Sequence, residues 1–302
     1  MIQRVSALLI LLLALGIQAA ERPRLALALG GGAALGYAHL GVLAVLEEEG
    51  IVPDLVTGAS MGSIVGGYWC AGMPLDSIRM EASELNLFKL LDWKLGKRGF
   101  FEWKKVRRRL DRRLGGLEIQ NLPVPLIAVA TDLYTGDRVM LDHGNLIDAM
   151  LASATIPGLY QPVTIAGREL VDGGLVDEVP ILSARDAGAL IVVAVDVSHP
   201  LLPADIGSPF DVMRQAYFII QMHNVAARAT QADVLIRPEL EGLDFQDFGQ
   251  VQEAEAAGRK AALEALPRIR ELLANTAFPA VSVPDAADSG SAESFPVKED
   301  AP

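Results

Sequence analysis

The sequence contains a single cysteine, Cys70, and only four histidines among its 302 residues. One cysteine cannot form an internal disulfide bond, and because Cys70 lies in an apolar stretch we expect a buried structural thiol. No two histidines are spaced with cysteine or aspartate in a way that suits a metal ion. The sequence therefore indicates neither a disulfide framework nor a metal site.

An excess of positive charge is also missing. Lysine and arginine number 26 against 38 aspartates and glutamates, which gives a formal net charge of −12. Domains that bind nucleic acid are characteristically basic, so we exclude nucleic acid as the main partner. Hydrophobic residues make up 51% of the chain and charged residues 21%, which is typical of a globular protein with a large core.

Apolar runs that would span a bilayer comfortably are missing too, since about 20 residues are needed. The run at residues 5–17 follows Arg4 and leads into small residues, which is typical of a secretory signal peptide. Cleavage after Ala20 would leave Gln18 where a small residue is favoured, so an inner-membrane anchor is the alternative. We therefore expect an exported protein, periplasmic or secreted.

The composition also divides the chain. Residues 278–302 are rich in proline, serine and acidic residues with few large apolar ones, which predicts a disordered tail. No repeat or obvious linker interrupts the rest. The expected organisation is a signal peptide at 1–20, one domain over 22–277 and the tail.

Short apolar segments alternate with helical segments from residue 25 onward. Strands are expected at 25–29, 55–57, 124–130, 189–195 and 233–237, and helices at 33–49, 63–70 and 251–273. The apolar runs at 124–130 and 189–195 are typical of strands buried on both faces. Strand, glycine turn, helix and strand in succession predict right-handed crossovers, a parallel sheet and an α/β fold.

Ser60 lies in the sequence Gly58-Ala59-Ser60-Met61-Gly62, between an expected strand and an expected helix. Gly58 and Gly62 permit a tight backbone path and keep side chains away from the hydroxyl group. The helix N-terminus that follows favours developing negative charge. A chain with 28 glycines produces such spacings by chance, but this setting favours a nucleophilic serine.

Two further glycine turns accompany Ser60. Gly30, Gly31 and Gly32 follow the first expected strand, where they form either an ordinary βα turn or a row of N–H groups suited to an oxyanion. Asp172 is followed by Gly173 and Gly174, a pattern that is usually only a turn. Because a serine nucleophile requires a base, Asp172 becomes a candidate for that role.

These three blocks, in this order and at these distances, resemble the patatin-like phospholipases. Residues 130–136 and 152–158 are also similar to stretches of the bacterial branch, and the resemblance covers most of residues 25–265. It implies a three-layer α/β sandwich with a central, mainly parallel sheet. It also implies a serine lipid acyl hydrolase of the phospholipase A or lysophospholipase type, with a serine–aspartate dyad and no cofactor.

Carried over by position, the resemblance makes Ser60 the nucleophile, Asp172 the base and the backbone at Gly30, Gly31 and Gly32 the oxyanion hole. An aspartate is a weaker base than histidine, but burial raises a carboxyl pKa by up to about 3–5 units. Where the family commonly has a basic residue before the next glycine, this chain has Leu35. That departure leaves a catalytically weak or inactive lipid-binding homologue as an alternative.

The residues also leave open a catalytic triad and a dinucleotide-binding site. His199 follows an expected strand, and Ser60, Asp172 and His199 keep the chain order of α/β-hydrolase triads, although that fold places its nucleophile after more strands. Glycines after the first strand also occur in dinucleotide-binding turns, but no acid ends the second strand to bind a ribose.

A basic segment at 97–113 stands out in this acidic chain, with nine lysines and arginines against two acids. Its helical spacing predicts an amphipathic helix that either lies on anionic lipid or packs its apolar stripe on the core. The residues expected to touch a membrane are Phe100, Phe101, Trp103, Arg107, Arg108 and Arg112. The predicted partners are therefore a phospholipid or lysophospholipid substrate and the surface of an anionic membrane.

Overall fold

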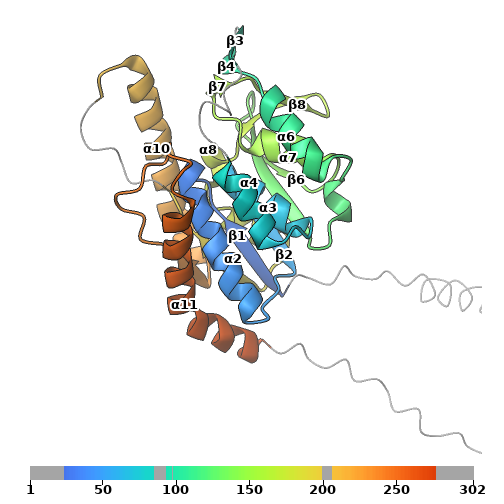
Figure 1. Ribbon diagram of the computed structural model, residues 1–302, viewed down its shortest axis with the longest axis vertical. Helices are drawn as coiled ribbons and strands as arrows, with labels where there is room; N and C mark the ends of the chain where they lie inside the picture. The colour runs from blue at the N-terminus through green and yellow to red at the C-terminus, as the bar shows by residue number, and fades with distance from the viewer. Residues whose placement is uncertain (1–23, 85–92, 97, 199–205, 277–302) are drawn as a thin grey trace, which may run out of the picture.

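The computed structural model describes residues 24–84, 93–96, 98–198 and 206–276 (Figure 1). Its centre is an eight-stranded sheet in the order β11-β10-β1-β2-β5-β9-β8, with β6 paired to β5. Five neighbouring strands run parallel: β1 (Leu25–Leu29), β2 (Leu55–Ala59), β5 (Leu126–Asp132), β10 (Ile191–Val195) and β11 (Val234–Ile236). Three pair antiparallel at one side: β6 (Arg138–Leu141), β8 (Val163–Ile165) and β9 (Arg168–Asp172). The predicted α/β fold with a mainly parallel central sheet is confirmed.

Helices cover both faces of this sheet, which makes three layers (Figure 1). Residues of β1 alternate between the faces, with Leu27 and Leu29 in one apolar cluster and Ala26 and Ala28 in the other. The first cluster is completed by α2 (Ala38–Glu48), α3 (Met61–Cys70), α4 (Leu75–Ser83), α6 (Lys104–Leu114), α7 (Leu146–Ser153) and α11 (Val251–Asn275). The opposite face carries α8 (Gly174–Asp177), α9 (Ile181–Asp186) and α10 (Pro209–Arg228).

A small second sheet in the order β3-β4-β7 stands beside the main one. It consists of β3 (Trp93–Gly96), β4 (Gly99–Phe101) and β7 (Gly158–Tyr160), and β4 and β7 run parallel. Short 3₁₀ turns complete the fold: η1 (Ala33–Tyr37), η2 (Ile119–Asn121) and η3 (Ala229–Gln231). The pairing of β4 with β7 brings Phe101 next to Tyr160, and both side chains contribute to the candidate site.

Element boundaries differ from the predictions by a few residues, for local reasons. The helix expected at 33–49 begins as the 3₁₀ turn η1, a common form of helix start, before α2 continues it. The strand expected at 124–130 lies at 126–132 instead. Pro125 has no N–H to donate, and only its carbonyl takes part, accepting from the Val56 N–H at 2.9 Å.

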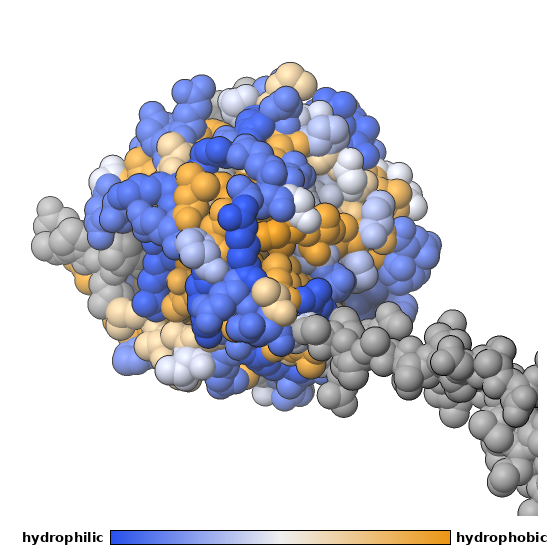
Figure 2. Space-filling view, turned by 90° about the horizontal axis from the view of Figure 1, so that it is seen from below, coloured by the Kyte–Doolittle hydropathy of each residue, from blue (hydrophilic) through white to orange (hydrophobic). Residues whose placement is uncertain are grey.

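Cys70 is fully buried, as predicted. Hydrophilic residues surround hydrophobic ones on the face seen from below in Figure 2, a normal mixture for a folded surface. Among the helices that the structure describes, none is both long enough and apolar enough to cross a membrane. The expected signal peptide at 1–20 and tail at 278–302 lie outside the described residues.

Candidate active site

Ser60 is the single residue between β2 and α3, on a sharp turn. Its φ of 49° and ψ of −121° are rare for a residue with a side chain and mark a strained backbone. Two serines hold that backbone: the Ser60 N–H donates to Ser153 Oγ at 3.0 Å, and Ser63 Oγ donates to the Ser60 carbonyl at 2.7 Å. The turn therefore fixes the Ser60 side chain at the start of α3.

Gly58 and Gly62 serve this turn through close approach of the backbone. An added Cβ at Gly58 would lie 2.6 Å from Ser63 Cα, and one at Gly62 would lie 2.1 Å from the Leu29 carbonyl oxygen. Neither glycine has a positive φ. Glycine is required at these positions because there is no room for a side chain, and the strained dihedral angle falls on Ser60 itself.

The structure brings Ser60 and Asp172 together. Ser60 Oγ donates a 2.8 Å hydrogen bond to Asp172 Oδ2, and the Gly174 N–H donates to the other oxygen, Oδ1, at 2.8 Å. Thr131 Oγ1 and the Thr155 carbonyl oxygen bond the Asp172 backbone at 2.7 and 2.8 Å. Asp172 is fully buried, and each of its two carboxylate oxygens accepts a hydrogen bond from a protein group.

Strand register explains why these two residues, 112 positions apart, meet. Strand β6 occupies one edge of β5 at residues 128–131. Two of these residues also pair with β2 and two with β9, so β2 and β9 share the opposite edge of β5. On that edge Ala59 pairs with Val129 and Asp172 pairs with Ala130. The parallel β2 and the antiparallel β9 thus run toward each other, and Ser60 and Asp172 stand where their ends meet.

The carboxyl group of Asp172 has the acid–base properties of a base that works near neutral pH. Burial raises its pKa from the ordinary 3.8 to about 6, although hydrogen bonds from the Gly174 amide and the Ser60 hydroxyl oppose the rise. The resulting pKa is close to the reference value of histidine, about 6.5. The environment therefore removes most of the disadvantage of an aspartate in this position.

Of the three glycine amides predicted as oxyanion donors, two already have acceptors. The Gly30 and Gly31 N–H groups donate to the carbonyl oxygens of Val195 and Glu178, each at 3.0 Å. Among the hydrogen bonds of the described residues, none has the Gly32 or Ala33 N–H as its donor. Ala33 also lines the cavity beside Ser60. Of the predicted donors only Gly32 has an N–H without an acceptor among the described residues, and Ala33, which was not predicted, is the next such donor along the loop.

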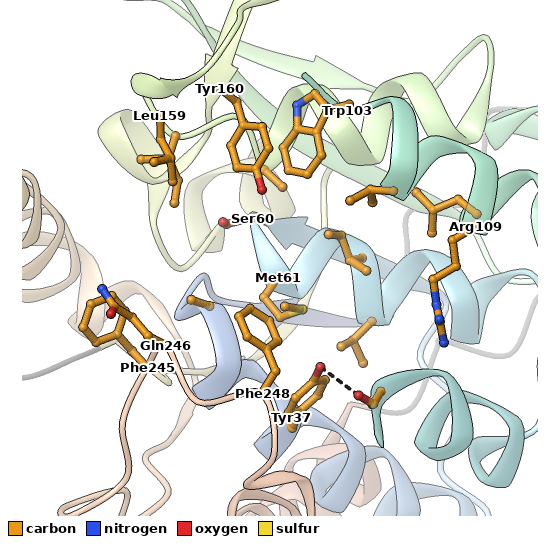
Figure 3. A pocket seen from close by; sticks show the side chains of 18 of the residues that line it. Tyr37, Ser60, Met61, Trp103, Arg109, Leu159, Tyr160, Phe245, Gln246 and Phe248 are labelled. Atoms are coloured by element: carbon orange, nitrogen blue, oxygen red, sulfur yellow. Dashed lines mark hydrogen bonds between the residues drawn. The ribbon is translucent and has the colours of Figure 1, made fainter. Parts of the chain in front are cut away.

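A cavity of about 580 Å³ opens beside Ser60, with almost wholly apolar walls (Figure 3). Helix α3 supplies side chains at helical spacing, Met61, Ile64, Val65 and Tyr68. The facing walls come from Tyr37, Trp103, Val106, Leu110, Tyr160, Phe245 and Phe248. Such a cavity suits a hydrocarbon chain, since burial of apolar surface is favourable and no polar partner is required.

Aromatic side chains in this wall include three of the residues predicted to touch a membrane, Phe100, Phe101 and Trp103. Trp103 stacks on Tyr160 with ring centroids 3.7 Å apart, and its Nε1 donates to Thr155 Oγ1 at 2.9 Å. Phe101 is only 5% exposed and also lines the cavity. Phe101 and Trp103 therefore face the cavity, and Phe100 lines it too but is 47% exposed to solvent.

The predicted amphipathic helix exists as α6, and its apolar stripe packs on the core. Val106, Leu110 and Leu114 are all buried there. Arg107 forms an ion pair with Asp148 of α7. The exposed basic face of α6 is left with other side chains, among them Arg108 and Arg112.

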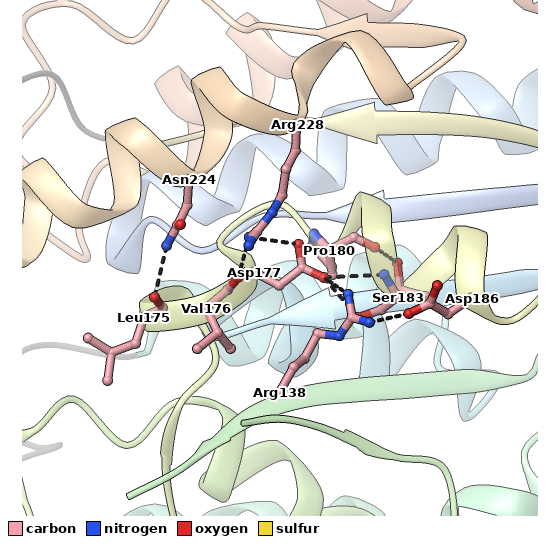
Figure 4. Close-up of polar contacts among 10 residues, drawn as sticks. Arg138, Leu175, Val176, Asp177, Pro180, Ser183, Asp186, Asn224 and Arg228 are labelled. Atoms are coloured by element: carbon pink, nitrogen blue, oxygen red, sulfur yellow. Dashed lines mark hydrogen bonds and ion pairs between the residues drawn. The ribbon is translucent and has the colours of Figure 1, made fainter. Parts of the chain in front are cut away.

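A buried polar network anchors the segment that follows Asp172 (Figure 4). Asp177 is fully buried in α8, where its Oδ2 accepts from Ser183 Oγ at 2.9 Å and from Arg138 at 3.2 Å. Arg228 of α10 reaches Oδ1 at 3.4 Å. Because α9, α10 and β6 are all bonded to this carboxylate, the segment that follows Asp172 is firmly anchored.

The structure describes His39, but not His199, the histidine of the triad alternative. His39 is fully buried, and burial lowers its pKa to about 4, so the neutral ring donates from Nε2 to the Gly30 carbonyl oxygen at 2.8 Å. His199 lies outside the described residues. No group of three or more histidine, cysteine, aspartate or glutamate side chains is arranged to hold a metal ion within the described ranges. Leu35, which stands where a basic residue is common in the family that the sequence resembles, is 1% exposed and lies in the core.

The sequence analysis did not identify several residues that support the site. Ser153, which holds the Ser60 backbone, and Thr155, which bonds Trp103, lie in the block 152–158, and the family resemblance of that block is the available signal. His39 and Glu178 have no such signal. Nothing in the local sequence marks these two, because their contacts are made across the fold.

Comparisons with known proteins identify the family of the chain. The chain matches the family described as Patatin-like phospholipase over residues 27–185. An uncharacterized NTE family protein of Mycobacterium tuberculosis is 38% identical over 188 residues, which are 61% of this chain and 52% of that protein. Neuropathy target esterase sws of Drosophila melanogaster is 28% identical over 179 residues, 57% of this chain and 13% of that protein.

The chain thus spans about half the length of its mycobacterial relative. Among solved structures, VipD from Legionella pneumophila superposes with a TM-score of 0.52 at 16% identity. The match covers 83% of this chain and 66% of that one. At this identity the similarity supports the fold.

Proposed function

This chain belongs to the patatin-like phospholipase family, and from that premise we propose that it hydrolyses acyl esters of phospholipids or lysophospholipids through an acyl-enzyme on Ser60. The observation that carries the proposal is the 2.8 Å hydrogen bond from Ser60 Oγ to the buried Asp172 carboxylate, beside an apolar cavity. A nucleophile, a base with a raised pKa and a site for an acyl chain are the parts that the reaction needs.

In the proposed mechanism Asp172 Oδ2 takes the proton of Ser60 Oγ as this oxygen attacks the ester carbonyl carbon. We assign the Gly32 and Ala33 N–H groups as donors to the carbonyl oxygen as it becomes negative, and one such donor typically contributes about 2.7–4 kcal/mol. The protonated Asp172 then returns its proton to the leaving alcohol. Water, deprotonated by Asp172, releases the fatty acid from Ser60.

The cavity supports a lipid substrate over a small polar ester. Met61, Ile64, Val65 and Tyr68 line it along one side of α3, so an acyl chain bound there would extend from Ser60 along the helix. This arrangement favours esters of fatty acids, and no cofactor enters the chemistry.

The direct contact between Ser60 and Asp172 also bears on the triad alternative. In a triad a histidine stands between the serine and the acid, whereas here Asp172 Oδ2 accepts the hydrogen bond from the serine hydroxyl itself. This contact favours the dyad, and His199 becomes the natural control residue for testing it.

The raised pKa of Asp172 leads to an expected pH dependence. Burial raises this pKa to about 6, and only the ionised carboxylate can take a proton. Hydrolysis of a soluble ester should therefore fall as the pH drops through about 6, approaching tenfold per pH unit further down. The measurement is kcat/KM of a short-chain ester between acidic and neutral pH. A decline centred near about 4, the ordinary value for aspartate, would contradict the proposed environment of the base.

We further propose that the protein docks on anionic membranes through the exposed face of α6 together with Phe100. Basic residues near an anionic surface contribute about 1 kcal/mol each. Reversing both Arg108 and Arg112 to glutamate should weaken sedimentation with anionic vesicles at least about tenfold, while hydrolysis of a soluble ester persists.

The matched control reverses two exposed cations of α11, Lys260 and Arg268, which lie outside the proposed docking face. Equal vesicle binding by the α6 variant and the wild type would dispose of the docking proposal. Export through residues 1–20 is likewise proposed from the sequence, and fractionation of the producing cells tests it.

A further inference from the structure

Glu178 follows α8 and is a buried acid that the mechanism above does not use. Glu178 is only 1% exposed to solvent. Its carbonyl oxygen accepts the Gly31 N–H at 3.0 Å, and its side-chain Oε2 accepts from Gln221 Nε2 of α10 at 2.7 Å. The other oxygen, Oε1, has no hydrogen-bond partner among the described residues. A buried carboxyl oxygen without a partner is costly and calls for an explanation.

The carboxyl group of Glu178 occupies the space between two glycine turns of the site. At Gly31 the three atoms nearest to an added Cβ all belong to this carboxyl group, with Oε1 at 2.7 Å. At Gly174 the nearest atom would be Glu178 Oε2, at 2.1 Å. Gly31 precedes the proposed oxyanion donors, and Gly174 donates to the Asp172 carboxylate. One side chain therefore touches both halves of the site.

The electrostatic surroundings of Glu178 favour its neutral form. Burial first, and then the neighbouring Asp172 and Asp196 carboxylates, raise its pKa well above the ordinary value. Asp177 of α8 adds to this, and the Tyr217 phenol of α10 faces the same carboxyl group. The titratable groups around Glu178 are thus acids from β9, α8, α10 and the segment that follows β10.

Two of these neighbouring acids, Asp196 and Asp177, have arginine partners. Asp196 pairs with Arg237 at 3.0 Å, and Asp177 pairs with Arg138 at 3.2 Å. In the described part of the chain Glu178 forms no ion pair. A charged carboxylate in such a place would be strongly disfavoured, whereas a protonated one is a neutral group of the right shape.

We propose that Glu178 is a positioning residue, a neutral carboxylic acid wedged between the glycine loop and the Asp172 turn. It holds the Gly32 and Ala33 amides at a fixed distance from Ser60. While protonated, it also leaves the oxyanion site free of a competing negative charge. This inference rests on the proposed hydrolysis, and it adds a second carboxyl whose protonated form is the active one.

The test compares Glu178→Gln with Glu178→Ala in the full-length protein, using a short-chain chromogenic ester. Glutamine has the shape of the neutral acid and cannot ionise, so this variant should keep kcat close to wild type. Alanine removes the wedge and should lower kcat about 10- to 100-fold, since small displacements of catalytic groups have effects of this size. KM should change little, because Glu178 does not line the cavity.

The pH profile separates positioning from mere structural support. At alkaline pH the wild type should lose activity as Glu178 ionises beside the oxyanion site, and Glu178→Gln should not. Asp177→Asn is the matched control: it removes a neighbouring buried acid and should lower the unfolding temperature while the alkaline loss persists.

Each outcome decides the matter. Wild-type kcat in Glu178→Ala would overturn the wedge, and identical alkaline profiles for wild type and Glu178→Gln would overturn the role of the proton. If Glu178→Ala does not fold, the Glu178→Gln profile still decides. A wild type without esterase activity would instead refute the proposed function, together with the inference that rests on it.

Discussion

Replacing Ser60 by alanine is expected to lower kcat for acyl-ester hydrolysis by about three orders of magnitude or more, as loss of a covalent nucleophile does in other hydrolases. The hydroxyl is the group that bonds Asp172 Oδ2, so the variant leaves the carboxylate without the nucleophile that it deprotonates. The assay compares single-turnover and steady-state hydrolysis of wild type and variant. Labelling by a fluorophosphonate probe should vanish in parallel.

The control for this prediction is Ser83→Ala, a serine near the end of α4 that does not line the cavity. It should keep wild-type hydrolysis and wild-type labelling. If Ser60→Ala hydrolyses the ester as fast as the wild type, the nucleophile is another residue. If the wild type itself neither hydrolyses esters nor takes the probe, the inactive lipid-binding alternative raised by Leu35 is correct.

Local sequence predicted the parts of this site well, because each part is a local structure. Ser60 between two glycines, after a strand and before a helix, predicted the sharp turn that the structure has. Burial was the expected reason for a raised pKa at Asp172, and that cause is the largest one there. Turns of this kind depend on a few neighbouring residues, so a short window contains the information.

The assembly of the parts depends on strand pairing, which no short window contains. A prediction of parallel strands says nothing of β9, which is antiparallel and approaches β2 along the same edge of β5. The same limit applies to the oxyanion donors. The sequence shows three glycines, but only the fold shows that Val195 and Glu178 already accept from Gly30 and Gly31.

Helix α6 shows a different limit, one of ambiguity. Val106, Leu110 and Leu114 have the spacing of an apolar stripe, and that spacing is the same for a core-facing helix and for a membrane-surface helix. The structure buries all three, so the apolar anchor for a membrane must come from elsewhere, such as Phe100. Periodicity identified the helix correctly and could not identify what it packs against.

Replacing Asp172 by asparagine is expected to lower kcat by about 10²- to 10⁴-fold, the usual contribution of general acid–base catalysis. The geometry makes this variant informative. Oδ1 accepts from the Gly174 N–H, so the asparagine oxygen would keep that place and its NH₂ group would face Ser60 Oγ. The amide would then donate to the serine oxygen and occupy the lone pair needed for attack, while taking no proton. Residual activity should lack the acidic decline near pH 6 that belongs to the Asp172 carboxyl.

The companion variant is His199→Ala, which removes the histidine of the alternative triad. With a dyad, this protein should hydrolyse esters at close to the wild-type rate and retain the decline near pH 6. The reverse pattern, hydrolysis that survives Asp172→Asn and is lost in His199→Ala, would show that histidine is the base. Because Asp172 Oδ2 already accepts the Ser60 hydroxyl directly, a histidine could act only if that contact opened first. Loss of both activities would therefore mean that the Ser60–Asp172 contact is a resting arrangement and that catalysis passes through a different one.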